Sequence, residues 1–576
     1  MTSSVAVDPA SVGISADGLM ATVADIASFG TRLAGSTAEA ATAQYIADRL
    51  GALGVANEII EFDAFIHWPE EAGITVDAPE SIHIAAAGVS FAKSTGSGAL
   101  VGQLADVSAG DAPRGRIALI DGLTHYDACV KAFEAGAIAI VGISTGSQRH
   151  NWQISPLWGP PTGEADTARF APLPAVQVNA QDGALLRKLA RSRATVALSA
   201  PIHAAWRKVQ MPVAEIAGEE PYFVLVGGHF CSWGPGATDN ATGNALMIEL
   251  ARLLAAGKRP RYGVRFCWWT GHEQGGYAGS AWYADHHWSE LRRNAIAYIN
   301  VDNLGTRGAT TKVLQNTTGE LSAYATDVLR ATVGEPSAED RAFKGWLRRR
   351  DKYVENSRCG RNGDQSFSGI GLPGVQISSY LPPSNPEQIP GSGMGWWWHT
   401  ADDLPGCAGA DVLSVDTLLH WNLLSGLINP QVLPLNLVVV AHDFLASLRE
   451  YAEAAPQLAE LVRLRDLSET FLDVARALEC CPIASGDAAS GMRNTLLLRV
   501  AKALNPVLHH ALSDYEYDIS RQSRLLPGLQ AALSLDQLNE DDYKMAKVAL
   551  RRKANRIGQA LSDATELIQS EIVLST

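Results

Sequence analysis

The chain has 576 residues, a formal net charge of −14 and seven cysteines. An excess of 61 acidic over 47 basic residues argues against general nucleic-acid binding, which needs basic surfaces. No apolar run approaches the roughly 18 residues of a membrane-spanning helix, and the first residues lack the basic and apolar segments of a secretory signal. The cysteines are few for this length, so we expect free thiols in a cytoplasmic protein of several domains.

The first 71 residues predict helices. Ser36 and Glu39 have the spacing of a capping box, which opens a helix that ends before Gly54. From residue 72 to residue 203 the pattern changes to short apolar β runs separated by glycines, with one helix-like stretch over residues 126–136. We therefore expect a β-rich domain of residues 72–203 inserted into the chain.

Residues 204–430 return to alternating strands and helices. Three predicted strands are nearly continuously apolar, as expected of parallel strands covered on both faces, and they span residues 222–228, 263–269 and 296–302. This predicts an α/β fold with a mixed, mostly parallel sheet sandwiched by helices, built from residues 1–71 and 204–430. After residue 431 glycines become sparse and four long helical patterns follow, so we expect a C-terminal helical bundle over residues 431–576.

Histidines and acidic residues follow these strands and the nearby turns. His229 ends one apolar run, Asp239 lies in a Gly-Ala-Thr-Asp-Asn turn, and Glu273, Asp302 and His399 follow other segments. The carboxyl edge of a parallel sheet is where open α/β folds place their chemistry. Imidazoles and carboxylates are natural ligands of zinc and similar divalent ions. Each residue alone is more often structural, but the set predicts a metal centre.

These segments resemble the zinc aminopeptidase family of metallopeptidases, family 28, which also includes glutamate carboxypeptidase II. The resemblance implies a zinc exopeptidase fold for residues 1–71 and 204–430. It also implies that the insert is similar to the protease-associated domain, which has no catalytic residues and shapes substrate entry in several family members. In the glutamate carboxypeptidase branch a C-terminal helical bundle supports dimerisation, so the resemblance implies a homodimer.

The same resemblance implies roles for five residues. Asp239 would bridge two metal ions, His229 and Asp302 would bind one of them, and His399 would bind the other. Glu273 would be the general base, because it lies six residues before a glycine of the family's Gly-x-x-Gly-Ser segment.

Two positions depart from the family's pattern. Gln274 stands where the family has a second glutamate, a metal ligand, so we expect the second ion to bind weakly. Cys231 stands where the family has an aspartate that orients the imidazole ligand; it could meet the metal as a thiolate or pack as a small apolar group. His272 could supply an unusual ligand. One or two zinc ions are therefore expected.

Substrate-binding residues are predicted in two later segments. Arg361 belongs to a basic stretch that begins at Arg341, and its guanidinium could hold a substrate carboxylate, although the stretch could instead balance nearby acids. Asp364 follows in a segment that resembles a family loop near the active site. Tyr380 ends an apolar run and could donate a hydrogen bond to a developing oxyanion.

The predicted function is metal-dependent hydrolysis of a peptide or small amide, by an exopeptidase or an amidase. A divalent ion lowers the pKa of water from 15.7 toward about 7, and Glu273 would accept the proton and pass it to the leaving amine. The alternative is a catalytically silent relative that uses the fold for binding, which the departures at Gln274 and Cys231 favour. We expect no nucleic-acid and no membrane partner.

Overall fold

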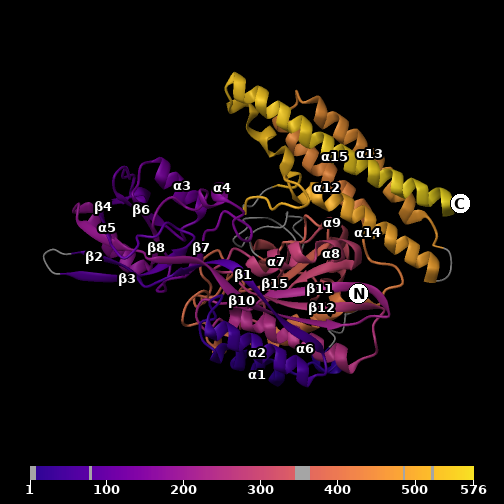
Figure 1. The fold of residues 1–576 in the computed structure, drawn as a ribbon, viewed down its shortest axis with the longest axis horizontal. Coiled ribbons are helices and arrows are strands. Elements are labelled where there is room, and N and C mark those ends of the chain that lie inside the picture. Colours follow the sequence, from indigo (N-terminus) through magenta and orange to yellow (C-terminus); the bar gives the residue numbers. More distant parts are fainter. Residues whose placement is uncertain (1–7, 77–80, 344–362, 484–486, 521–523, 576) are drawn as a thin grey trace.

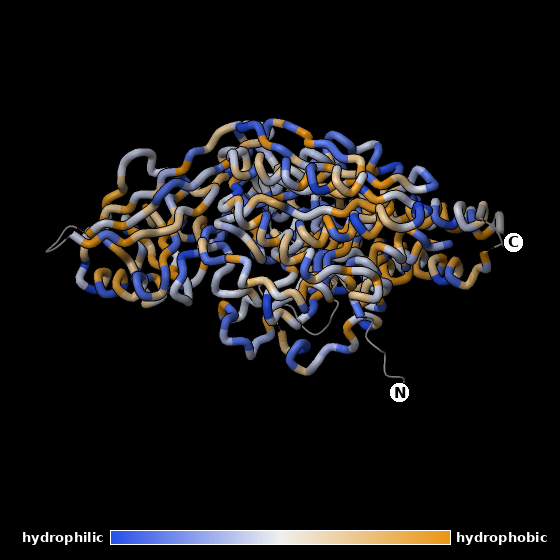
Figure 2. The backbone as a smooth tube through the Cα atoms, turned by 90° about the horizontal axis from the view of Figure 1, so that it is seen from below, coloured by the Kyte–Doolittle hydropathy of each residue, from blue (hydrophilic) through white to orange (hydrophobic). Residues whose placement is uncertain are grey.

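The computed structural model describes residues 8–76, 81–343, 363–483, 487–520 and 524–575. Figure 1 shows a central sheet flanked by helices, a second sheet at one end of the molecule and a group of long C-terminal helices above the central sheet. The view from below agrees that the second sheet and the C-terminus lie at opposite ends (Figure 2). In the described part of the chain, no helix is both long and apolar enough to cross a membrane.

The central sheet has seven strands, of which the inner four run parallel. Antiparallel strands complete both edges, so the mixed α/β fold predicted from the sequence is confirmed. In spatial order the strands are β1 (Ala56–Pro69), β10 (Ile202–Ile216), β12 (Tyr262–Trp269), β11 (Glu220–His229), β13 (Ala295–Asn300), β15 (Gly374–Tyr380) and β14 (Thr311–Gln315).

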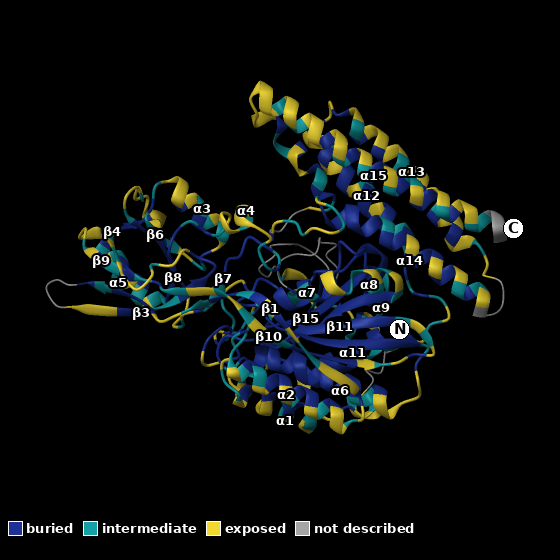
Figure 3. Cartoon of the chain, in the orientation of Figure 1, coloured by how far each residue is buried: buried dark blue, intermediate teal, exposed yellow. Residues whose placement is uncertain are grey.

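The two faces of this sheet are covered by different helices. Along β11, Val224 and Val226 join a core with helices α1 (Ala16–Ser28), α2 (Thr37–Ala52), α6 (Thr242–Ala256) and α11 (Ala410–Ile428). Phe223 and Leu225 point to the other face and pack with α7 (Ala278–His286) and α8 (Trp288–Asn294). Because successive side chains of a strand alternate between faces, both faces of β11 are buried, as its apolar run predicts (Figure 3).

The second sheet has eight strands, all between residues 72 and 199. The chain leaves the central sheet through β1 and returns through β10, and these two strands pair antiparallel from Ala56 opposite Glu215 to Pro69 opposite Ile202. In spatial order the strands are β2 (Ala72–Val76), β9 (Thr195–Ser199), β4 (Leu100–Asp106), β5 (Ile117–Asp121), β6 (Ala139–Ile143), β8 (Ala175–Val178), β3 (Ile82–Ser90) and β7 (Trp152–Gln153). Below, residues 72–199 are called the insert.

Four long helices follow the central domain. They are α12 (Leu437–Ala454), α13 (Ala459–Cys480), α14 (Asp487–His509) and α15 (Glu540–Ser575). Their buried residues, such as Phe444, Leu464 and Leu561, belong to the same continuous core as α1 and α6. These helices are therefore packed against the rest of the protein.

Candidate metal centre

Five buried side chains converge at the carboxyl edge of the central sheet. His229 is the last residue of β11, Asp239 lies in the turn Ala237–Ala241 that begins α6, and Asp302 follows β13. Glu273 lies in the loop after β12, and His399 lies before α11. All five are at most 6% exposed. The parallel strands end at one edge, which is why residues distant in sequence meet there.

The polar atoms of these side chains form two groups that share Asp239. In the first group, His229 Nε2 lies 3.0 Å from Asp239 Oδ1 and 3.5 Å from Asp302 Oδ1. In the second group, His399 Nε2 lies 2.9 Å from Asp239 Oδ2 and 3.0 Å from Glu273 Oε1. Tetrahedral zinc with bonds of about 2.1 Å separates neighbouring ligand atoms by about 3.4 Å. The spacing and the nitrogen and oxygen donors of both groups therefore fit a divalent ion.

Each histidine of the two groups has its other ring nitrogen held by a backbone carbonyl. His229 Nδ1 lies 2.9 Å from the carbonyl of Cys231, and His399 Nδ1 lies 2.8 Å from the carbonyl of Asn151. A carbonyl only accepts, so Nδ1 carries the proton and Nε2 is left to face an ion. Cys231 thus orients the imidazole through its backbone, while burial raises the pKa of its thiol and disfavours a thiolate.

Glu273, rather than Gln274, faces the second group. Glu273 Oε2 accepts a hydrogen bond of 2.9 Å from Trp233 Nε1, which leaves Oε1 toward His399. Gln274 turns away, and its Oε1 accepts from the backbone N–H of Ala34 at 3.3 Å. The carboxylate that faces the second group therefore comes from Glu273, which the resemblance assigns as the general base, and the position of the family's second glutamate, Gln274, faces elsewhere.

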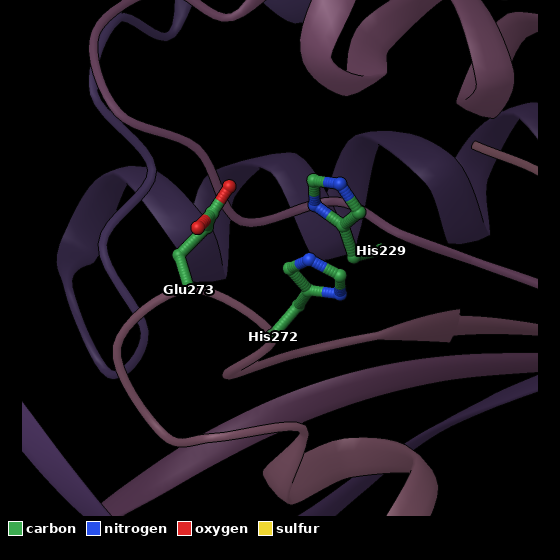
Figure 4. Close-up of side chains that lie close together, drawn as sticks. All are labelled: His229, His272 and Glu273. Atoms are coloured by element: carbon green, nitrogen blue, oxygen red, sulfur yellow. The ribbon is translucent and has the colours of Figure 1, made fainter. Parts of the chain in front are cut away.

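His272 lies beside the candidate ligands without belonging to either group that shares Asp239. Its ring stacks on that of His229 with 4.1 Å between centroids (Figure 4). His272 Nδ1 lies 2.8 Å from Asp364 Oδ2, and Asp364 Oδ1 accepts a hydrogen bond of 2.7 Å from Ser280 Oγ. Burial alone would lower the pKa of His272, but the Asp364 carboxylate helps to raise it. The sequence indicates His272 only as an unusual ligand, because its pairing with a residue far along the chain leaves no local pattern.

The residues predicted to bind substrate lie in different places. Both carboxylate oxygens of Asp364 are engaged by side chains of this chain, and the residue is 1% exposed. Tyr380 ends β15, and its hydroxyl donates to Gln315 Oε1 at 3.0 Å. Burial raises the pKa of Tyr380, so its hydroxyl stays protonated. Arg361 lies outside the described residues.

Comparison with known proteins agrees with this arrangement. The model of peptidase family M28 matches residues 213–408, a range that includes all five converging side chains. This chain contains a peptidase family M28 domain. Transferrin receptor protein 2 of Rattus norvegicus is 33% identical over 89 residues, which are 15% of this chain and 11% of that protein. A probable glutamate carboxypeptidase of Zea mays, VP8, is 36% identical over 89 residues, which are 15% of this chain and 12% of that protein.

The fold of the M28 domain is shared with a solved structure. A zinc aminopeptidase from Bacillus subtilis superposes with a TM-score of 0.55 at 21% identity, covering 73% of this chain and 97% of that one. The sequence matches to the curated relatives above span only about one eighth of the length of those proteins. The solved structure therefore establishes the fold of this domain.

A buried arginine holds the loop that carries Asp239 in the M28 domain. Arg32 is fully buried, and its guanidinium donates to backbone carbonyls from both sides of that loop. The acceptors are the carbonyls of Phe230, Pro235, Gly236, Gly30 and Ile26. Asp403 then accepts from the backbone N–H groups of Thr238 and Asp239, at 3.0–3.1 Å. The candidate bridging carboxylate is thus fixed by residues from the N-terminal segment and from the loop after His399.

Replacing Arg32 by methionine should lower the free energy of unfolding of the metal-free protein by at least about 3 kcal/mol. Each buried carbonyl left without a donor costs about 1–3 kcal/mol, and Arg32 serves several. Urea unfolding monitored by circular dichroism measures the change. Arg49→Met is the matched control, because Arg49 is on the surface of α2 and should change stability by less than about 0.5 kcal/mol. Equal losses in the two variants would show that the buried hydrogen bonds of Arg32 contribute little.

Metal binding by the M28 domain should release protons. Burial alone would lower the pKa of His399, but Glu273 and Asp239 raise it to about 10, so the metal-free ring is protonated at neutral pH. A metal ion needs the neutral ring. Zinc titration by calorimetry at about pH 7.5, in buffers of different ionisation enthalpy, should therefore show release of at least about one proton, fewer in His399→Ala.

The same raised pKa gives the metal-free protein a defined pH dependence. A histidine whose pKa is higher in the folded than in the unfolded state stabilises the fold most when both states are protonated. For His399 that contribution is complete below its ordinary value of 6.5 and is lost as the pH rises through about 10.

Proposed function

We propose that the protein is a metal-dependent hydrolase of peptide or small amide bonds, acting as an exopeptidase or an amidase, with zinc as the natural ion. The observation that carries the proposal is the pair of donor groups that share Asp239, with one carboxylate oxygen facing each group. His229 and Asp302 would complete the first ion's ligands, and Glu273 and His399 those of the second. Since a carboxylate rather than Gln274 faces the second position, we propose two ions of comparable affinity.

His272 is proposed as the group that moves the proton. A bound divalent ion supplies a water of lowered pKa and polarises the scissile carbonyl. Glu273 is engaged by Trp233 and by the second donor group, whereas His272 has one nitrogen fixed by Asp364 and the other on the side of the site. His272 Nε2 would accept the proton of the attacking water and return it to the leaving amine, while Asp364 keeps the ring in the right tautomer. Tyr380 would turn its hydroxyl from Gln315 Oε1 and donate to the developing oxyanion.

The alternative is a binding protein without catalysis. In the sequence, Gln274 and Cys231 depart from the family's pattern, and these departures favour a binding protein. Gln274 is directed away from the site, and Cys231 orients His229 through its carbonyl, so neither departure removes a candidate ligand. This favours the enzyme.

The test is metal analysis of the purified protein combined with a screen of aminoacyl, N-acyl and glutamyl amides. We expect two zinc ions per chain and hydrolysis of one class, lost on treatment with a chelator and restored by zinc. Hydrolysis that persists in metal-free protein would contradict the proposal. Bound zinc without hydrolysis of any amide would favour the binding protein.

The remaining parts of the chain are proposed to serve this activity. The insert would act as a protease-associated-like domain at the edge of the site. The C-terminal helices expose Val462, Met545 and Val548, which supports a homodimer formed through them. Light scattering of the purified protein tests the dimer. From cysteine usage we propose a cytoplasmic location.

A further inference from the structure

A short segment of the insert reaches the second donor group. Residues 150–152 lie at the end of the insert nearest the central domain, where β7 pairs with β3 (Figure 1). The ring of Trp152 lies 5.8 Å from that of His399 and 5.5 Å from that of Trp398, between centroids. This segment therefore contacts a candidate ligand although it belongs to a different sheet.

The contact is made by hydrogen bonds on both sides of His399. The carbonyl of Asn151 accepts from His399 Nδ1 at 2.8 Å, and the N–H of Asn151 donates to the carbonyl of His399 at 3.0 Å. The neighbouring ring of His150 is held by the carbonyl of Trp398, with 2.6 Å between Nδ1 and that oxygen. His399 has a positive φ of 58°, which L residues adopt infrequently. Its backbone and its ring are thus both fixed by the insert.

The loop that carries Glu273 is also held by the insert. The N–H of Gly159 donates to the carbonyl of Gly276 at 2.6 Å, and the ring of Trp158 stacks on Tyr277 with 4.2 Å between centroids. The first donor group differs, because the Nδ1 of His229 is held by Cys231 of its own loop. The two ligands that belong to the second group alone, Glu273 and His399, therefore depend on the insert. The histidine of the first group, His229, does not.

We propose that the insert assembles the second metal site, so that docking of residues 150–152 determines whether the second ion binds. The inference rests on the proposed function. Removing the partner that orients a histidine ligand typically lowers metal affinity by about 10–100-fold. Coupling between two binding events is reciprocal, so the second ion should in turn hold the insert against the central domain. The insert would then regulate the occupancy of the site as well as contact it.

Zinc affinity of the full-length protein tests the proposal, measured by competition with a chromophoric chelator. The variants are the double substitution His150→Ala with Trp152→Ala, and separately Asn151→Pro, which removes the N–H that donates to His399. We expect one ion to keep its wild-type affinity and the other to bind about 10–100-fold more weakly. His399→Ala should weaken the same ion and serves as the reference. Phe133→Ala, an exposed aromatic of the insert on α3 (Tyr126–Glu134), is the matched control and should retain both ions.

Hydrogen exchange of the wild-type protein gives a second readout that needs no insert variant. Peptides covering residues 148–156 should gain protection at saturating zinc, when the second donor group is filled, and should not gain it in His399→Ala. Two ions of wild-type affinity in the 150–152 variants, equal weakening of both ions, or unchanged exchange would each overturn the proposal. A wild-type protein that binds no zinc would overturn the proposed function itself.

Discussion

Replacing Asp239 by asparagine should remove both metal ions and lower kcat/KM by at least about 10³-fold. Asp239 is the one described residue whose two oxygens face both donor groups, at 3.0 Å from His229 and 2.9 Å from His399. An amide cannot present two anionic oxygens, so both ions lose a ligand and the site keeps less negative charge to hold them. Loss of the ions removes the lowered pKa of water and the polarised carbonyl, which together contribute several kcal/mol to the barrier.

The measurement combines zinc content with turnover of whichever amide the screen identifies. Asp63→Asn is the matched control, because Asp63 is a surface residue paired with Lys208 and should change neither quantity. Full turnover in Asp239→Asn after dialysis against chelator would show that hydrolysis does not use this site.

Replacing His272 by glutamine should lower kcat by about 10²–10⁴-fold, the usual contribution of a general base, while both zinc ions remain bound. Glutamine can still accept or donate near Asp364 but cannot carry a proton between water and an amine. Glu273→Gln should behave differently, because Glu273 Oε1 faces His399 in the second donor group. We expect this variant to lose the second ion and to lose activity as a consequence.

The two variants distinguish two candidates for the general base. The structure favours His272, and the sequence predicts Glu273. If Glu273→Gln binds two zinc ions with unchanged affinity and has no turnover, Glu273 is the base and the sequence-based assignment holds. If His272→Gln retains full turnover with both ions bound, His272 has no part in proton transfer. Asp364→Asn adds a check, since loss of the carboxylate should shift the pH profile of kcat without changing zinc content.

The sheet was predictable because its signals are local. The apolar runs 222–228 and 263–269 coincide with β11 (Glu220–His229) and β12 (Tyr262–Trp269) to within two residues, since a strand buried on both faces needs apolar side chains at every position. The polar residues at the strand ends then had to share one edge of the sheet. For that reason the structure brings together all five side chains that the sequence singled out.

The finer geometry of the site depends on contacts that leave no local pattern. Glu273 faces the second donor group while Gln274 bonds to the backbone of Ala34, and the order of residues in the chain does not reveal these directions. The orientation of His399 depends on the carbonyl of Asn151, and a backbone carbonyl is present at every position of any sequence.

The antiparallel pairing of β1 with β10 allows the residues between these two strands to be deleted or exchanged. Pro69 and Ile202 are paired neighbours in the sheet, so the chain between them leaves and re-enters the central sheet at adjacent positions. Joining those two positions by a short turn closes a small loop, which costs little conformational entropy. The strand order of the central sheet does not depend on what lies between them, so this fold can gain, lose or exchange such a module without being rebuilt.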